Sequence, residues 1–362
     1  MRIRLITATP QSVREGSGTF VAGETLRRGL AALGHEVRVV APARRAPRVP
    51  YTLHRFAFNW RLGVGDVRGA DLVVGFDMDG FRLAGRLPVA FVAYIHGILA
   101  DEARFERGLV AASMRLQSRA ERTSVRRAAR VLTVSRYARR RISEIYGIPP
   151  ERVAVVPPPL DVARWRSALE AHAGPRDGPA TVLCVGRMYP RKNIASLVRA
   201  AALLRARQPS AQVRIVGDGP ERSRLEHLVR RLNLGGHVRL EGQLGFDELA
   251  RAYAECDIFC LPSLQEGFGL VFLEAMAAGR PVVCCSGTAV EELVEDGVHG
   301  VVVPQRNDAA LADALARLLA DADARRRMGS ANRAVADRFA PPAVAQQFLD
   351  AVSTPPTGEV PR

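Results

Sequence analysis

Short apolar runs rich in Val, Ile and Leu alternate along the chain with longer amphipathic stretches of helical spacing. This pattern is typical of parallel strands buried on both faces and joined by crossover helices. The predicted strands are 3–7, 37–41, 72–75, 89–95, 131–134 and 153–156, then 181–185, 213–216, 238–241, 258–261, 282–284 and 300–303. Predicted helices between them include 19–33, 119–129, 194–206, 221–232 and 309–320.

A segment rich in proline and glycine separates the two halves. Three consecutive prolines at 157–159, and the loop AGPRDGP from residue 173, cannot continue a strand or a long helix. We place the boundary within 160–180. The predicted parts are a first domain over 1–165, a second domain over 166–335, a C-terminal helix over 336–353 that packs back on the first domain, and a disordered tail over 354–362. The sequence therefore predicts an α/β fold with two doubly wound, Rossmann-like domains facing a cleft.

Length and composition exclude several classes of protein. A chain of 362 residues with 48% hydrophobic residues is long enough for two cored domains, which rules out a single small binding module. No apolar run reaches the ~18–20 residues of a membrane span, and the first residues resemble a buried strand rather than a signal peptide. The five cysteines lie in apolar runs without paired metal spacing. We therefore expect a cytoplasmic protein with buried cysteines and neither a structural metal nor a disulfide framework.

The segment LPSLQEGFGLVFLEAMAAGRPVV, from residue 261, carries the strongest chemical signal. It predicts the end of a strand, a loop containing Glu266, and a helix over 270–278. Its glycines let the backbone approach a ligand, and amides at a helix amino end suit phosphate oxygens. Glu266 can accept hydrogen bonds from hydroxyls, and Glu274 in the helix can reach the vicinal hydroxyls of a ribose.

A second turn between strand and helix, GRMYPRKNI from residue 186, adds two cations. Arg187 and Lys192 lie on either side of the turn, and Asn193 is the predicted helix cap. A forked guanidinium and a compact ammonium together suit a diphosphate leaving group. Lys192 is also the single lysine among 52 basic residues, which favours a position that needs a point charge. The glycine turns VGDGPE, from residue 216, and EGSGTF, from residue 15, are weaker signals of the same kind.

Taken together, these residues resemble glycosyltransferase family 4, the retaining, nucleotide-sugar-dependent enzymes of the GT-B fold. The likeness covers nearly the whole chain and is strongest over 181–303. It implies transfer of a hexosyl-type sugar from a nucleoside-diphosphate sugar to a lipid-linked or other envelope glycan acceptor. Because Arg187 and Lys192 are already available to the diphosphate, we expect no metal cofactor. His96, in the sequence YIHG, matches the family's active-site histidine.

The resemblance also implies a role for each site residue. The implied catalytic residues are Glu266, His96, Arg187 and Lys192. The implied donor-binding residues are Gly16, Gly18, Gly186, Arg187, Lys192, Gly217, Leu244, Glu266, Gly267, Phe268, Gly269, Leu270 and Glu274. The pair Asp77 and Asp79 resembles the metal-binding Asp-x-Asp of a different glycosyltransferase fold. We interpret it instead as a solvated loop or a contact for acceptor hydroxyls.

Two other functions are compatible with the same architecture. One is a nucleotide-sugar epimerase or phosphorylase, for which the spacing of Glu266 and Glu274 is unusual. The other is a non-catalytic nucleotide-sugar-binding subunit, which the intact set of charged site residues disfavours.

Charge is divided unevenly between the halves. Residues 1–165 contain 28 Arg against 14 acidic residues, so they carry nearly all of the net charge of +15. Few aromatic residues accompany the arginines, which argues against nucleic acid as a partner. Arg115, Arg119, Arg122, Arg126 and Arg130 recur at helical spacing, with Leu116, Ala120 and Val125 predicted to face elsewhere. This pattern fits either an anionic membrane surface or a solvated helix.

Overall fold

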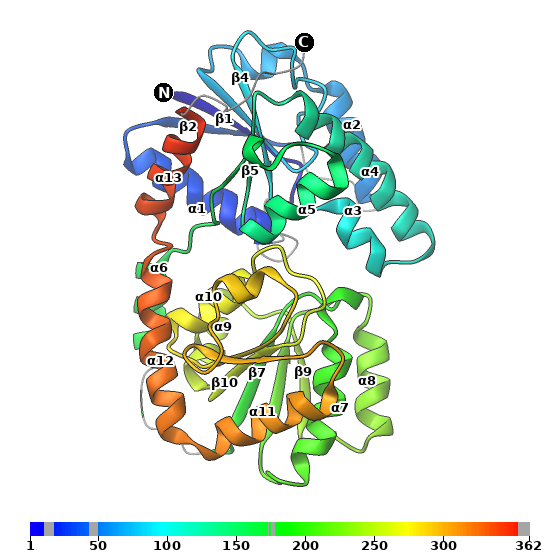
Figure 1. The fold of residues 1–362 in the computed structure, drawn as a ribbon, viewed down its shortest axis with the longest axis vertical. Helices are drawn as coiled ribbons and strands as arrows, with labels where there is room; N and C mark the ends of the chain where they lie inside the picture. The colour runs from blue at the N-terminus through cyan, green and yellow to red at the C-terminus, as the bar shows by residue number, and fades with distance from the viewer. Residues whose placement is uncertain (11–17, 43–49, 173, 175–177, 354–362) are drawn as a thin grey trace. The chain divides into compact units, whose positions relative to one another are not determined.

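The computed structural model describes residues 1–10, 18–42, 50–172, 174 and 178–353 (Figure 1). It divides into two compact units. Unit 1 comprises Met1–Pro159 and Pro341–Arg362, and unit 2 comprises Leu160–Ala340. The predicted tail over 354–362 and the predicted donor contact Gly16 lie outside the described residues.

Unit 1 is a parallel sheet covered by helices. Its strand order is β2-β1-β3-β4-β5-β6, and every pairing is parallel. The strands are β1 (Arg2–Ile6), β2 (Glu36–Val40), β3 (Leu72–Phe76), β4 (Ala90–Ile95), β5 (Arg130–Thr133) and β6 (Val153–Val155). The helices are α1 (Gly18–Ala32), α2 (Tyr51–Arg61), η1 (Val64–Val67), α3 (Leu99–Glu102), η2 (Ala103–Phe105), α4 (Gly108–Arg127), α5 (Arg136–Tyr146), η3 (Pro150–Arg152) and α13 (Pro341–Ser353).

Unit 2 repeats this architecture with the order β12-β11-β10-β7-β8-β9, again all parallel. Its strands are β7 (Thr181–Val185), β8 (Gln212–Val216), β9 (Val238–Gly242), β10 (Ile258–Leu261), β11 (Val282–Cys285) and β12 (Gly300–Val303). Its helices are α6 (Val162–Glu170), η4 (Pro190–Lys192), α7 (Ile194–Arg205), α8 (Arg222–Arg231), α9 (Phe246–Glu255), α10 (Leu270–Ala277), η5 (Ala289–Glu292), α11 (Asp308–Ala320) and α12 (Ala322–Asp337).

The predicted strands and fold class are confirmed in both units. Strands β3, β7, β10 and β11 are buried along their whole length, which explains why each reads as an uninterrupted apolar run. All five cysteines are buried, as expected. The helix predicted over 119–129 is longer, because α4 begins at Gly108. Every helix in the described part of the chain is too short or too polar to span a lipid bilayer.

The unit boundaries differ from the predicted ones. Unit 2 begins at Leu160 rather than at residue 166, because α6 packs within it. The Trp165 ring lies 4.9 Å from that of Phe246 and 5.5 Å from that of Tyr253. The predicted C-terminal helix starts later than residue 336, since α12 ends at Asp337 and α13 begins at Pro341.

Helix α13 returns the chain to unit 1, where it packs beside α1 (Figure 1). Its Phe348 is fully buried, and the ring lies 6.2 Å from that of Tyr94. The last helix therefore completes the core of the first unit.

Each sheet reverses its strand order at one place. In unit 1 the reversal lies between β1 and β3, and in unit 2 it lies between β7 and β10. At such a switch point the loops from the two neighbouring strands leave in opposite directions, and ligands bind outside the carboxyl ends of the strands. The loops after β1, β3, β7 and β10 are therefore positioned to form ligand-binding sites.

Close backbone contact at the end of β7 requires glycine at position 217. Gly217 has φ +128°, and a Cβ atom there would overlap the carbonyl oxygen of Gly186. The Gly217 amide also donates to the Gly242 carbonyl at 2.7 Å. The loops after β7, β8 and β9 are thus joined through their backbones.

We predict that Gly217→Ala lowers the free energy of unfolding of unit 2 by about 3 kcal/mol, because it combines backbone strain with overpacking. Trp60→Phe leaves Trp165 as the only tryptophan, so its fluorescence in urea reports unit 2. Gly236→Ala is the matched control, since a Cβ there meets nothing within 4 Å. Equal stability of the two variants would contradict the prediction.

Candidate functional site

The site in unit 2 is built from the two loops at its switch point. After β7 the chain passes through Gly186 and Arg187 into η4, which ends at Lys192. After β10 it passes through Glu266 to Gly269, the residue before α10. The Leu264 amide donates to the Arg191 carbonyl at 2.8 Å, so the two loops are tied together.

Asn193 reinforces this link in a way that differs from its prediction. It precedes α7 with φ +51°, but its side chain makes no capping hydrogen bond. Its side-chain Nδ2 instead donates to the Pro262 carbonyl at 3.3 Å. A residue predicted to cap a helix therefore joins the loop after β7 to the loop after β10.

Lys192 and Glu266 meet in a buried ion pair. Lys192 Nζ donates to Glu266 Oε1, and Ser263 Oγ donates to the same oxygen at 3.1 Å. Only 12% of the Lys192 side chain and 6% of the Glu266 side chain are exposed. Burial alone would raise the pKa of Glu266, but the charges of Lys192 and Arg191 outweigh it and lower that pKa. Glu266 is therefore ionised at neutral pH.

Arg187, in the same loop as Lys192, has a hydrogen-bond donor without a partner among the described residues. That donor is the buried Nε. Its guanidinium carbon lies 5.5 Å from the centre of the Tyr189 ring. A buried donor without a partner is costly, so this atom is suited to an anionic ligand.

The loop before α10 presents backbone rather than side chains. Gly269 has φ +94°, and a Cβ there would lie 2.7 Å from the Phe272 ring. Phe268 is buried, with its ring 5.5 Å from that of Phe339. Gly267 lies in the same loop, and Leu270 begins the helix. The helix dipole and the first amides of α10 therefore favour negative charge here.

Glu274 lies in the second turn of α10 and is partly buried. Tyr253 Oη, from α9, lies 2.9 Å from Glu274 Oε2 and 3.1 Å from the Val271 carbonyl. Burial raises the pKa of Glu274 to about 7, although the hydrogen bond from Tyr253 acts in the opposite direction. This carboxyl therefore changes charge near neutral pH.

The remaining predicted donor contacts of unit 2 lie on neighbouring strand ends. Gly186 follows β7, Gly217 follows β8, and Leu244 follows β9, where it is partly exposed. Parallel pairing brings all three to the same edge of the sheet.

In unit 1, His96 follows β4 and Gly18 begins α1. The His96 ring lies 5.2 Å from that of Phe76 and 4.3 Å from that of Tyr94. Its Nδ1 is buried without a partner among the described residues. Burial lowers the pKa of His96 to about 3, so the ring is neutral.

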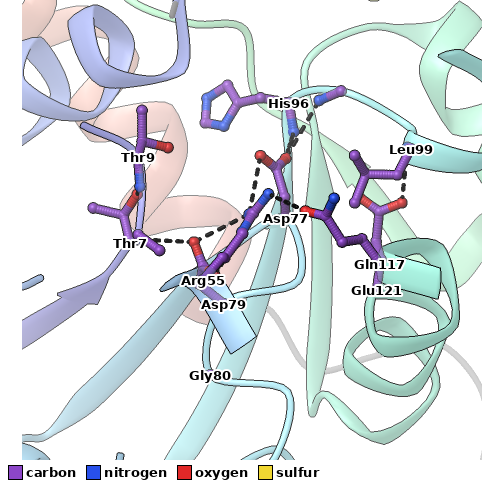
Figure 2. Close-up of polar contacts among 12 residues, drawn as sticks. Thr7, Thr9, Arg55, Asp77, Asp79, Gly80, His96, Leu99, Gln117 and Glu121 are labelled. Carbon is purple, nitrogen blue, oxygen red and sulfur yellow. Dashed lines mark hydrogen bonds and ion pairs between the residues drawn. The ribbon is translucent and has the colours of Figure 1, made fainter. Parts of the chain in front are cut away.

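The prediction of a solvated loop for Asp77 and Asp79 is wrong. Asp79 is fully buried and accepts hydrogen bonds from Arg55 Nε at 2.9 Å and Arg55 Nη2 at 3.1 Å (Figure 2). It also accepts from Asn59 Nδ2 at 2.9 Å and from the Ala8 amide at 2.7 Å. These four donors occupy the acceptor sites of one carboxylate. Asp79 is thus committed to partners within the protein.

Sequence reasoning missed Arg55 and Asn59 entirely. Both are buried on α2, at positions i and i+4 on one face of the helix. Two polar residues of that spacing on an otherwise amphipathic helix are the signal that points to a buried polar cluster.

Comparisons with known proteins agree with this architecture of two doubly wound units. Residues 17–164 match the family described as Glycosyltransferase Family 4, and residues 166–335 match the family described as Glycosyl transferases group 1. The chain belongs to glycosyltransferase family 4, of the GT-B type, which confirms the resemblance seen in its motifs.

One relative is a GDP-mannose-dependent alpha-(1-6)-phosphatidylinositol monomannoside mannosyltransferase of Mycobacterium tuberculosis, 36% identical over 56% of this chain and 56% of that protein. The match thus spans about half the length of this relative. An uncharacterized glycosyltransferase of Methanocaldococcus jannaschii is 28% identical over 89% of this chain and 90% of that protein. Sucrose-phosphate synthase from Thermosynechococcus elongatus shares the fold, with a TM-score of 0.82 at 24% identity over 97% of this chain and 98% of that chain.

We predict that Glu274 makes the stability of unit 2 depend on pH. A carboxyl whose pKa is raised by folding stabilises the protein below its unfolded value of 4.5, and this contribution is lost as pH rises through about 7. The stability of wild type relative to Glu274→Gln should therefore fall by about 3 kcal/mol between pH 4.5 and 8. Urea titrations followed by Trp165 fluorescence measure it.

The control for this experiment is Glu170→Gln, at an exposed carboxyl that ends α6. Its stability should follow that of wild type across the same range. A difference between wild type and Glu274→Gln that does not change with pH would show that Glu274 does not titrate as described.

Proposed function

We propose that the protein is a retaining glycosyltransferase that moves a hexosyl group from a nucleoside-diphosphate sugar to an acceptor hydroxyl. The observation that carries this proposal is the buried Lys192–Glu266 pair at the switch point of unit 2. At this position Lys192 offers a cation to a diphosphate, and Glu266 offers a carboxylate to sugar hydroxyls.

The charges of the site fit departure of a diphosphate. Arg187 and Lys192, with the first amides of α10, stabilise the negative charge that develops on the leaving group. Glu274 in its ionised form accepts hydrogen bonds from the ribose, and Glu266 accepts them from the sugar. The C1–O bond to the diphosphate breaks while the acceptor oxygen bonds to C1 on the same face, and the acceptor proton passes to the departing phosphate.

This mechanism assigns no step to a metal ion. Two cationic side chains and a helix amino end already neutralise the diphosphate. The name of the mycobacterial relative specifies GDP-mannose and a phosphatidylinositol mannoside, which supports a nucleotide-linked hexose as the donor and a lipid-linked glycan as the acceptor here.

A panel of UDP-, GDP- and ADP-sugars identifies the donor by thermal stabilisation, since a ligand at 100 times its Kd adds about 2.7 kcal/mol. Products formed with and without acceptor then separate transfer from epimerisation and from simple binding. An anomeric configuration equal to that of the donor supports retention, and inversion would overturn it.

With that donor, Lys192→Met should raise the transfer barrier by about 2–4 kcal/mol, because one charge-stabilising donor is lost. Glu266→Gln should mainly slow transfer, and Glu274→Gln should mainly weaken donor binding. Steady-state kinetics in excess EDTA measure all three, with Arg231→Met on the exposed face of α8 as the control. A requirement for added Mg²⁺, or normal kinetics in all three variants, would contradict the assignment.

We also propose that unit 1 binds the anionic surface of the cytoplasmic membrane, where a lipid-linked acceptor resides. Arg115, Arg119 and Arg122 are exposed on α4, and so is Leu116, contrary to the predicted pattern. Arg130 does not belong to this face, because it lies in β5 and is buried.

Apolar side chains accompany these arginines. Leu109 on α4 is 89% exposed, and Leu53 and Trp60 on the neighbouring helix α2 are more than 60% exposed. Thr52 and Ser113 join the two helices with a hydrogen bond of 2.6 Å. Exposed leucine and tryptophan on helices that also expose arginine are typical of surfaces that lie at a lipid headgroup layer.

We expect Arg115→Gln/Arg119→Gln/Arg122→Gln to lose binding to anionic vesicles in sedimentation assays, since each basic residue near anionic lipid contributes about 1 kcal/mol. The matched control replaces three exposed arginines of α8, in Arg224→Gln/Arg230→Gln/Arg231→Gln. Equal binding of wild type to neutral and anionic vesicles, or equal loss in both triple variants, would leave α4 as a solvated helix.

A further inference from the structure

Asp77 directly follows β3 and combines a strained backbone with hydrogen bonds to the backbone after β4. Its φ is +53°, a left-handed conformation that residues other than glycine rarely adopt. Its Oδ1 accepts hydrogen bonds from the His96 amide at 2.9 Å and from the Gly97 amide at 3.3 Å (Figure 2). One carboxylate oxygen thus holds the backbone on which the His96 ring is mounted.

A buried polar cluster holds Asp77 in turn. The four donors to Asp79 tie the ends of β1 and β3 to α2. Arg55 Nη2 also lies 3.9 Å from Asp77 Oδ2, so the same guanidinium faces both acids. The Gly80 amide donates to Asn59 Oδ1 at 2.7 Å and closes the loop that contains both aspartates. The strained conformation of Asp77 is therefore determined by its surroundings.

The His96 ring lacks such support of its own. Nδ1 has no partner among the described residues, and the ring rests on Phe76 and Tyr94. Figure 2 shows the ring turned away from Asp77, whose carboxylate faces the backbone of His96. An active-site histidine usually has its orientation set by a hydrogen bond to one ring nitrogen. Here the polar support acts on the backbone.

We propose that Asp77 is a positioning residue that fixes the His96–Gly97 backbone, and through it the His96 ring, for sugar transfer. The proposal rests on the proposed function, in which His96 is the catalytic histidine that the family resemblance implies. Arg55, Asn59 and Asp79 keep Asp77 in place. In this role Asp77 acts on the reaction only through His96.

The charges around Asp77 make its ionisation adjustable. Arg55 from α2 faces it, and Asp79, Glu121 from α4 and Tyr146 from α5 interact with it electrostatically. Burial raises the pKa of Asp77 to about 6, and Arg55 and the two backbone amides only partly offset this effect. Protonation at lower pH weakens the two hydrogen bonds that hold residues 96 and 97.

The effects of Asp77→Asn on stability and on transfer should differ, and this difference distinguishes a positioning role from a purely structural one. Because folding raises the pKa of Asp77, its ionised form costs stability above about pH 6. Asp77→Asn keeps an acceptor oxygen and tolerates a left-handed backbone, so its Tm at pH 7.5 should equal or exceed that of wild type. The kcat/KM for transfer should nevertheless fall about tenfold, because the His96 ring is held less firmly.

The test compares wild type, Asp77→Asn and Asp77→Ala across pH 5–8. Wild type should lose kcat/KM for transfer below about pH 6, and Asp77→Asn should lack this acid limb and keep more activity than Asp77→Ala. Asp66→Asn is the matched control, because Asp66 Oδ2 also accepts from a backbone amide, that of Gly63, at 2.8 Å. Unchanged transfer kinetics and an unchanged acid limb in Asp77→Asn would overturn the proposal.

A second measurement is independent of any transfer activity. In the protein without ligands, the amide NMR signals of His96 and Gly97 should shift with an apparent pKa near 6 in wild type and stay constant in Asp77→Asn. If no nucleotide sugar supports transfer, the proposed function fails, and these signals still decide the role of Asp77. Amide signals that titrate equally in both proteins would overturn it.

Discussion

Parallel pairing of buried strands is the constraint on which both units depend. Every strand of a parallel sheet ends at the same edge, so all the loops that leave the strands at their carboxyl ends meet there. One reversal of strand order in each sheet then separates two loops and leaves room between them. Each unit has a buried ion pair at its switch point. The pair is Lys192–Glu266 in unit 2 and Arg55–Asp79 in unit 1.

Both ion pairs are buried, and neither is an obvious source of stability. Removing two charges from water costs several kcal/mol per ion unless further hydrogen bonds satisfy them. Asp79 meets this requirement with four donors, whereas Glu266 relies on Lys192 and Ser263 at a single oxygen. The first pair therefore serves as a structural clamp. In the proposed function, the second pair contacts the donor.

Each unit also has a strained residue in a loop at its switch point. Asp77 and Asn193 both adopt left-handed conformations in loops that leave a switch-point strand. Each uses its side chain to join two segments, since Asp77 accepts from the backbone after β4 and Asn193 donates to the backbone after β10. Such strain persists only where neighbouring contacts determine the conformation. In both units these contacts surround residues proposed to meet substrate.

The local sequence pattern predicted the twelve strands, the two doubly wound sheets, the loops that contain Lys192 and Glu266, and the helix that contains Glu274. These features depend on local periodicity and on which residues follow an apolar run. Tertiary structure alone decided that Arg130 is buried, that Asn193 joins two loops, and that Phe348 of α13 lies beside Tyr94 in the core of unit 1. It also decided that Asp79 pairs with Arg55 on a helix 24 positions earlier. The physical reason is that the burial of a strand is encoded in its own residues, whereas the partner of a charge depends on which segments the fold brings together.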